Sequence, residues 1–350
     1  MPMDEIGLLE ELVAIPSVSG EEDACANHLV ERMTVLGFRA YRDAVGNVVG
    51  ELGDRRAART VVLLGHMDTV AGHIPVRREG GFLYGRGAVD AKGPLAAFVW
   101  AAARAADDLN GTRVLVVGAV DEEAGSRGAR YLADMMTPPD AVIIGEPGGW
   151  DGITLGYKGT LRIDYHLTTA AGHGAGDRTA PAEEAVGFWN RLASHTAERN
   201  GDRRPPRFDT LDLGLQGIQT RGDGLTETVE MEVGMRIPPG LDVVKLKERV
   251  LGWAGEARVT FPYQEPPYRA AKNSCVVRAL LRAVRRAGGH PRFKVKTGTS
   301  DMNVVGPAWG CPIAAYGPGD SGLDHTPDER LCLVEFGRAV RVLADALREL

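Results

Sequence analysis

The chain has 350 residues, of which 44% are hydrophobic and 25% charged, with a net charge of −6. This composition is typical of a globular protein of one large or two ordinary domains, and the negative charge argues against nucleic acid as the main partner. No apolar run reaches the roughly 18 residues of a membrane span, the acidic N-terminus does not resemble a signal peptide, and the scattered cysteines predict reduced thiols in the cytoplasm.

The first 158 residues alternate between helical and strand-like patterns. Helical periodicity covers LLEELVAI and residues 21–36. TVVLLGH, TRVLVVGAV and AVIIGEP are near-continuous apolar runs, which suit strands buried on both faces of a parallel or mixed sheet. Between the first two runs, PLAAFVWAAARAADDL predicts a helix with Pro94 near its start, where proline is tolerated.

The pattern changes near Gly159, where LRIDYHLTT alternates apolar and polar residues, as a half-exposed strand does. The elements predicted after it are a helix at 181–199, strands around 208–218 and 227–236, a helix at 240–252 and a strand at 257–261. This βαββαβ order is typical of a ferredoxin-like layout, in which helices cover one face of a small sheet.

After Pro267 the first pattern returns, with a helix at 276–287, strands near 292–296 and 312–316, and a closing helix from Leu331. The simplest interpretation is one α/β domain with a mixed sheet, built from both ends of the chain. Its parts are residues 1–158 and 267–350, and residues 159–266 form an inserted ferredoxin-like α+β lid.

Two histidines and five acidic residues stand at the ends of strand-like runs or in turns rich in glycine and proline. They are His66, Asp68, Asp90, Glu122, Glu123, Glu146 and His325. Folds of the α/β class place functional groups at such positions. Two divalent cations need imidazole and carboxylate ligands, a bridging carboxylate and a separate base for water, and this set supplies each part. The sequence therefore predicts a two-metal hydrolase site.

Single members of this set have simpler interpretations. His66 alone fits a strand cap, and Asp90 alone fits a helix N-cap equally well. The adjacent Glu122 and Glu123 repel each other unless a cation or proton lies nearby, so one is expected to bind metal and the other to take a proton from water. GRG at 85–87 suggests a dinucleotide fingerprint, but Asp90 stands where its third glycine should be.

The chain resembles the di-zinc amidohydrolases and peptidases that include acetylornithine deacetylase, succinyl-diaminopimelate desuccinylase and carboxypeptidase G. The matching stretches run in family order from about residue 8 to residue 345: GHMDTV, YGRGAVDAKGP, DEEAGSRGA, GEP, GHGAG, KTGTSDMN and DHTPDE. The resemblance implies a mixed-sheet catalytic domain with a lid that forms a homodimer. It also implies two divalent metal ions per subunit, zinc by default and cobalt as an alternative.

The resemblance also implies a role for each site residue. His66, Asp90 and Glu146 would hold one metal, and Asp90, Glu123 and His325 the other, with Asp90 as the bridge. Glu122 would be the general acid and base, Asp68 would position His66, and His173 would reach across the dimer to the oxyanion. Substrate contacts would come from Arg236, Thr297, Gly298, Thr299 and Ser300.

Two longer stretches, GHMDTVAGHIPVRREGGFLYGRGAVDAKGPLAAF and YGPGDSGLDHTPDERL, resemble one branch of this family. That branch releases lysine or ornithine from an amino-group carrier protein, by cutting the amide between the carrier's terminal γ-glutamyl group and the α-amine. The alternatives are a deacylase or dipeptidase for small substrates, and a metal-binding or carrier-docking protein without catalysis. Such carriers are acidic, so a basic docking surface is expected from Arg203, Arg204, Arg207, Arg77 and Arg78.

Overall fold

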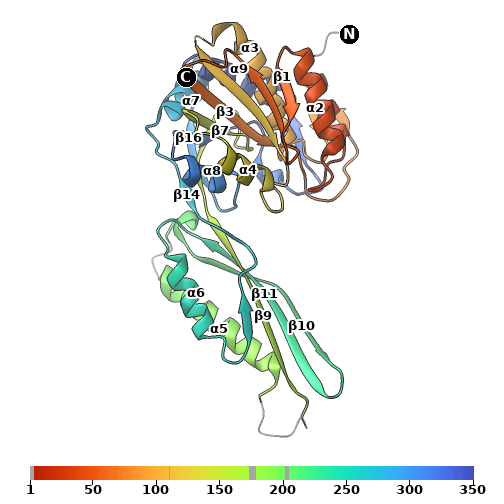
Figure 1. Ribbon diagram of the computed structural model, residues 1–350, viewed down its shortest axis with the longest axis vertical. Helices are drawn as coiled ribbons and strands as arrows, with labels where there is room; N and C mark the ends of the chain where they lie inside the picture. The colour runs from red at the N-terminus through yellow and green to blue at the C-terminus, as the bar shows by residue number, and fades with distance from the viewer. Residues whose placement is uncertain (1–3, 110, 173–178, 202–204) are drawn as a thin grey trace. The chain divides into compact units, whose positions relative to one another are not determined.

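Two units make up the computed structural model, which describes residues 4–109, 111–172, 179–201 and 205–350 (Figure 1). The first unit comprises Met1–Gly156, Arg269–Val295 and Ser300–Leu350, and the second comprises Tyr157–Tyr268 and Lys296–Thr299. Residues 296–299 therefore group with the second unit, although their place in the sequence predicts the closing part of the first.

A mixed sheet of nine strands runs through the first unit, as predicted for its fold class. Its order is β1-β2-β6-β3-β7-β16-β8-β14, and β15 also pairs with β8. The strands are β1 (Arg39–Arg42), β2 (Val48–Leu52), β3 (Arg59–His66), β6 (Thr112–Ala119), β7 (Ala141–Ile144), β8 (Gly152–Tyr157), β14 (Tyr268–Arg269), β15 (Arg292–Lys296) and β16 (Ile313–Ala315). Strand β3 is parallel to β6 and β7, whereas β2 is antiparallel to β6.

Helices cover this sheet because its central strands are apolar on both faces. The side chains of β7 and of the last six residues of β3 are buried, as the continuous apolar runs predict. The core cluster includes residues of α1 (Glu5–Ala14), α2 (Asp23–Val35), α3 (Lys92–Ala105), α7 (Cys275–Arg286) and α9 (Leu333–Leu347). Helix α3 packs against both β3 and α9.

The second unit has the predicted βαββαβ order. Its sheet runs β10-β11-β9-β12, with β13 (Gln264–Glu265) also on β9, and α5 and α6 lie on one face (Figure 1). The main elements are β9 (Gly159–Ala170), α5 (Pro181–Asn200), β10 (Asp212–Gly222), β11 (Thr226–Ile237), α6 (Val243–Gly252) and β12 (Arg258–Thr260). Alternate residues of β9 are buried, and they share a separate core with α5, α6 and β11.

Several short elements were not predicted. They are α4 (Arg127–Met135), α8 (Met302–Trp309), the strands β1, β2, β8, β13 and β14, and the small sheet of β4 (Arg77–Glu79), β5 (Phe82–Tyr84) and β17 (Arg330–Cys332). Each is too short to show a clear periodicity. The closing helix, predicted from Leu331, begins at Leu333, because the residues before it form β17. The strand predicted at 208–218 starts only at Asp212, because residues 207–209 form a 3-10 turn that buries Phe208. Among helices of the described residues, none combines the length and hydropathy that a membrane span needs.

Candidate metal centre

The ends of three neighbouring strands bring most of the predicted ligands to one edge of the sheet. Strands β6, β3 and β7 are adjacent and parallel, so their carboxyl ends lie together. His66 is the last residue of β3, Glu122 and Glu123 come just after β6, and Glu146 comes just after β7. The polar residues that follow three apolar runs, far apart in sequence, therefore lie at the same edge of the sheet.

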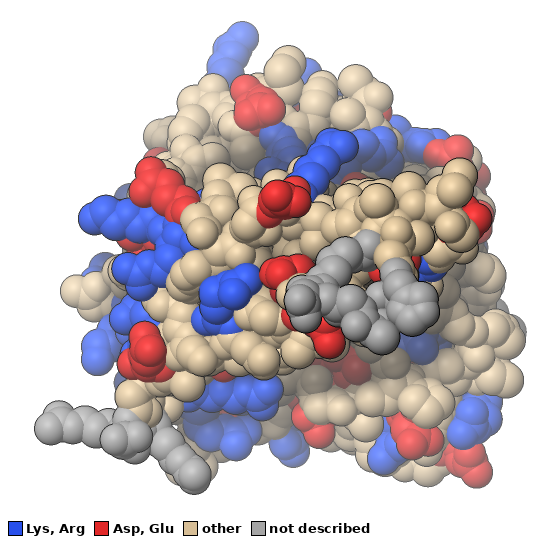
Figure 2. Space-filling view, turned by 90° about the horizontal axis from the view of Figure 1, so that it is seen from below, with Lys and Arg blue, Asp and Glu red and all other residues tan. Residues whose placement is uncertain are grey.

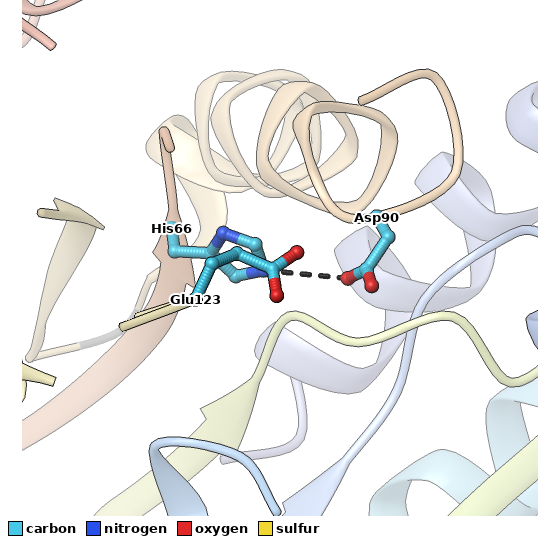
Figure 3. A group of neighbouring side chains, drawn as sticks. All are labelled: His66, Asp90 and Glu123. Carbon is cyan, nitrogen blue, oxygen red and sulfur yellow. Dashed lines mark ion pairs between the residues drawn. The ribbon is translucent and has the colours of Figure 1, made fainter. Parts of the chain in front are cut away.

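Asp90 lies between two imidazoles. Its Oδ1 is 3.4 Å from Nε2 of His66, and its Oδ2 is 3.1 Å from Nε2 of His325. Glu123 Oε1 lies 2.9 Å from the same nitrogen of His325. Figure 3 shows His66, Asp90 and Glu123 pointing toward one another, and their ligand atoms all lie within 4.8 Å. Two oxygens of one carboxylate therefore face two different imidazoles, an arrangement that suits a bridge between two cations.

The orientation of His66 leaves one nitrogen available for a metal. Its Nδ1 lies 3.0 Å from the carbonyl oxygen of Asp68, and because a carbonyl only accepts, the proton of the neutral ring is on Nδ1. When the ring is neutral, the lone pair is on Nε2, which is buried and has no hydrogen-bond partner among the described residues. Burial lowers the pKa of His66, but Glu122, Asp68 and Asp90 raise it well above its ordinary value, so a cation at Nε2 would take the place of a proton. An orphaned buried nitrogen that faces a carboxylate fits a divalent cation.

The carboxylates around Glu122 also favour a bound cation. Burial raises the pKa of Glu122 well above its ordinary value, and Glu146, Asp301 and Glu123 raise it further against the opposing effect of His66. Burial also raises the pKa of Glu123, against its hydrogen bond with His325. Among the described residues several carboxylates crowd this site beside two imidazoles, so the donor set fits hard divalent ions.

Glu122 is suited to proton transfer. Its Oε2 lies 3.9 Å from Nε2 of His66, and it lies outside the compact group of His66, Asp90 and Glu123. A carboxyl whose pKa is raised by burial can accept a proton near neutral pH and release it again. Glu122 thus has the surroundings of a base beside the predicted ligands, and a purely structural metal site does not need such a group.

Asp68 connects His66 to the loop that carries Glu122 and Glu123. The backbone N–H groups of Glu122 and Glu123 donate to its two oxygens at 3.1 and 3.0 Å, and Ser19 Oγ donates to Oδ2 at 2.7 Å. Burial alone would raise its pKa, but the hydrogen bond with His66 and the other donors lower it below the ordinary value. Asp68 is therefore held as a carboxylate, and it orients both sides of the site.

Glu329 is a positioning residue that the sequence analysis missed. Its Oε1 accepts hydrogen bonds from the backbone N–H groups of Val89 and Asp90 at 2.9 and 3.1 Å. Its Oε2 accepts from Arg86 at 2.8 Å, and the residue is only 1% exposed. Glu329 therefore holds the backbone that presents Asp90. The signal was present, because Glu329 ends the matching stretch DHTPDE.

Asp301 was missed as well. It directly precedes α8, it is buried, and its carboxyl raises the pKa of Glu122. Burial raises the pKa of Asp301 to about 7, against the opposing effect of His66. The matching stretch KTGTSDMN contains Asp301, but the resemblance implied substrate contacts for residues 297–300 of that stretch and no role for Asp301.

Backbone strain concentrates at this site. Among the described residues, three non-glycine residues have a positive φ: Asp121 at 66°, Ser126 at 50° and His325 at 62°. Asp121 and Ser126 flank the turn that carries Glu122 and Glu123, and His325 is itself a predicted ligand. Such conformations are costly and persist where the surroundings over-determine them, as at active sites.

The predicted substrate contacts are not brought together with the metal ligands within one unit. Arg236 is exposed on β11, and it lies with Thr297, Gly298 and Thr299 in the second unit. Ser300 belongs to the first unit, where its hydroxyl accepts a hydrogen bond from the N–H of Met302 at 3.2 Å. His173 falls outside the described residues. These assignments stay predictions.

Two arginines of the expected basic docking surface have acidic neighbours in the structure. Arg77 pairs with Glu79 at 3.2 Å, and Arg78 forms an ion pair with Glu10. Both cations are therefore neutralised locally. Arg207 is exposed in the second unit, and Arg203 and Arg204 fall outside the described residues. The docking surface stays a prediction.

Known proteins are similar to this chain in sequence and in fold. A family model described as Peptidase family M20/M25/M40 matches residues 62–349. A LysW-lysine hydrolase of Deinococcus radiodurans is 46% identical over 353 residues, which cover 98% of this chain and 96% of that protein. A putative LysW-lysine/LysW-ornithine hydrolase of Thermococcus kodakarensis is 39% identical over 347 residues, or 99% of this chain and 92% of that protein.

Solved structures agree in fold. The M20 family metallo-carboxypeptidase Sso-CP2 of Sulfolobus solfataricus aligns with a TM-score of 0.79 and 21% identity over 99% of both chains. Human carnosine dipeptidase 1 aligns with a TM-score of 0.77 and 18% identity over 99% of this chain and 95% of that one. At these identities the likeness shows a common fold.

Proposed function

The chain belongs to the peptidase family M20/M25/M40, and on that premise we propose that it releases L-lysine from an amino-group carrier protein. The bond cut is the amide between the γ-carboxyl of the carrier's C-terminal glutamate and the α-amine of lysine. The names of the relatives that align over nearly the full chain support this substrate. The observation that carries the catalytic part is Asp90, whose two oxygens face His66 and His325 beside the raised-pKa carboxyl of Glu122.

Two divalent metal ions belong to this proposal. His66, Asp90 and Glu146 would hold one, and Asp90, Glu123 and His325 the other, so that Asp90 bridges. Zinc is the default for mixed imidazole and carboxylate donors, with cobalt as an alternative. When bound, the ions polarise the amide carbonyl and make a water molecule more acidic.

The side chains supply the proton transfers. Glu122 accepts a proton from the attacking water, whose oxygen forms the new bond to the amide carbon. When the carbon–nitrogen bond breaks, Glu122 delivers that proton to the leaving α-amine, so one water is consumed for each bond cut. Asp68 holds His66 and the loop of Glu122 in their positions during the reaction. His173 from the partner subunit of a homodimer stabilises the oxyanion.

Substrate recognition is assigned to the second unit, which acts as a lid. Arg236 holds the carboxylate of the substrate, and residues 297–300 form the loop along it. The enzyme acts in the cytoplasm and catalyses one step of lysine synthesis. Ornithine release, which would serve arginine synthesis, is the alternative specificity, because some relatives are named for both substrates.

The decisive experiment measures the release of free amino acid from three substrates side by side: carrier protein loaded with lysine, carrier loaded with ornithine, and N-acetyl-lysine. Enzyme depleted of metal and then reloaded with zinc or cobalt should regain activity, with the highest kcat/KM on carrier-bound lysine. A kcat/KM on N-acetyl-lysine that equals that on the loaded carrier would favour a small-molecule deacylase. No release from any substrate by metal-loaded enzyme would favour a non-catalytic protein.

A further inference from the structure

One segment of the chain is strongly basic. Residues 266–300 contain nine Lys and Arg and no Asp or Glu, although the whole chain has a net charge of −6. The cations are Arg269, Lys272, Arg278, Arg282, Arg285, Arg286, Arg292, Lys294 and Lys296. By contrast, on the face drawn in Figure 2 the Lys and Arg side chains lie among Asp and Glu side chains.

Part of this charge is neutralised by neighbouring elements. Arg282 and Arg286 both pair with Glu349, and Arg292 lies 2.7 Å from Asp151. These three arginines therefore contribute little net charge to a partner.

Lys272 and Lys294 differ, because within the described residues neither forms an ion pair. Both line one pocket of about 710 Å³, together with Arg269. Since this pocket has cations and no carboxylate in its wall, its electrostatic complement is an acidic partner.

The same pocket has an apolar side formed by an exposed strand edge. Phe293 and Val295 line it and are 49% and 40% exposed. They are two positions apart on β15, so they lie on the same face of the strand. Among the described strands β15 pairs with β8 alone, which leaves its other edge open. Open edges with exposed apolar residues are sites where an extended peptide can add as a further strand.

This surface is connected to the metal centre on two sides. Strand β15 leads through residues 297–300 into Asp301, whose carboxyl acts on the pKa of Glu122. The loop that begins with Glu146 passes Gly149, where an added Cβ would lie 4.0 Å from Nζ of Lys294 and 3.7 Å from carboxylate oxygens of Asp151 and Glu335. These two oxygens already accept hydrogen bonds, from Arg292 and from the backbone N–H groups of Trp150 and Gly319. A partner laid along β15 would therefore lie beside the segments that carry the site.

We propose that the β15 surface, formed by Lys272, Phe293, Lys294 and Val295, docks an acidic extended segment of the carrier protein near its lysine-bearing C-terminus. Carboxylates of the segment pair with the two lysines, its apolar side chains cover Phe293 and Val295, and its backbone pairs with the open edge of β15. This docking rests on the proposed function. A free acyl-lysine lacks such a segment.

The test compares two double charge reversals of equal size. Lys272→Glu with Lys294→Glu changes the pocket, whereas Arg56→Glu with Arg285→Glu changes two exposed arginines that do not line it. The pocket variant should lower kcat/KM for lysine-loaded carrier about 10–100-fold, mainly through KM, because charge complementarity acts on association. The control variant should change it less than about 3-fold.

N-acetyl-lysine separates docking from folding and catalysis. Both variants should hydrolyse it at close to the native rate, since neither change touches the metal centre. Raising salt from about 0.05 M to about 0.5 M should slow the native enzyme on the carrier and slow the pocket variant much less. The neutral pair Lys272→Gln with Lys294→Gln should give an intermediate loss, and it replaces the reversal if that variant does not fold.

The outcomes distinguish the docking surface from the function. Equal kcat/KM on carrier for native enzyme and the pocket variant would overturn the docking surface and leave the proposed function intact. An equal loss in the pocket and control variants would show an effect of net charge alone and would also overturn it. A native enzyme that cleaves N-acetyl-lysine but not loaded carrier would overturn the carrier function, and the docking partner with it.

Discussion

Neighbouring carboxylates of the candidate metal centre differ in their surroundings. Asp90 has one oxygen near each of two imidazoles, and its backbone N–H is held by Glu329. Among the described residues Glu122 has one imidazole within 4 Å, that of His66, and burial together with nearby carboxylates raises its pKa. Surroundings that stabilise the charged carboxylate, as at Asp90, suit a metal ligand. Surroundings that favour the protonated carboxyl, as at Glu122, suit a group that accepts and releases a proton.

Glu122→Gln should retain both metal ions and lose activity, because the substitution removes the proton acceptor and keeps the shape. Turnover should fall by at least the roughly 10²–10⁴-fold that positioned acid–base catalysis supplies. Steady-state kinetics and metal analysis by mass spectrometry check this. Asp90→Ala is the contrasting variant and should lose metal. Near-native turnover in metal-loaded Glu122→Gln would contradict the assignment.

Glu329→Ala should weaken metal binding, although Glu329 itself touches no metal in this scheme. The substitution leaves the N–H groups of Val89 and Asp90 without this acceptor and removes the carboxylate that pairs with Arg86. Loss of such a supporting hydrogen bond typically costs about 10–100-fold in metal affinity or activity. Competition with a chelator measures the affinity.

Glu329→Gln supplies the control for this prediction. It keeps an oxygen acceptor for the backbone N–H groups, so it should recover most of the metal affinity while the ion pair with Arg86 is lost. An Ala variant with unchanged affinity would mean that the turn holds Asp90 without help.

At the scale of elements, the two units have separate hydrophobic cores. In the second unit, the alternating pattern of β9 turns one face toward α5, and the rings of Tyr165 and Phe188 lie 4.8 Å apart. The contact between this strand and this helix therefore contributes to the stability of the second unit, and its contribution can be tested without altering the metal centre.

Phe188→Ala should reduce the free energy of unfolding of the second unit by about 3–5 kcal/mol, since the side chain is fully buried and its removal leaves a cavity. Urea denaturation followed by circular dichroism measures the change. Val186→Ala, on the same helix but 50% exposed, should change it by less than about 0.5 kcal/mol. Similar losses in both variants would argue against a core centred on Phe188.

At the scale of the whole molecule, the proposed mechanism needs two subunits, because His173 is assigned to the site of the partner. Chains with His173→Ala and chains with Glu122→Gln should each be inactive alone. When they are mixed and allowed to exchange, heterodimers should regain activity, since one of their two sites then has both a native His173 and a native Glu122.

Native mass spectrometry verifies the exchange, and release of lysine measures the recovery. A fully exchanged mixture without activity would place His173 in the site of its own chain or give it a structural role. A protein that remains monomeric at assay concentrations would also contradict the proposal.

The sequence alone determined the elements with a clear period and the residues at their ends. Apolar runs predicted β3, β6 and β7, and alternation predicted β9, because burial on one or both faces leaves a local pattern. His66, Glu123 and Glu146 were recognisable as candidates because each follows such a run, and parallel strands bring their carboxyl ends together.

Only the tertiary structure decided which partners the polar groups have. The hydrogen bond between Glu329 and the backbone of Asp90 joins residues 239 positions apart, and the ion pair between Arg78 and Glu10 joins residues 68 apart. The first adds a positioning residue to the site, and the second gives Arg78 an acidic partner within its own chain. Periodicity reports how a segment faces its core, whereas hydrogen bonds and ion pairs depend on where distant segments meet.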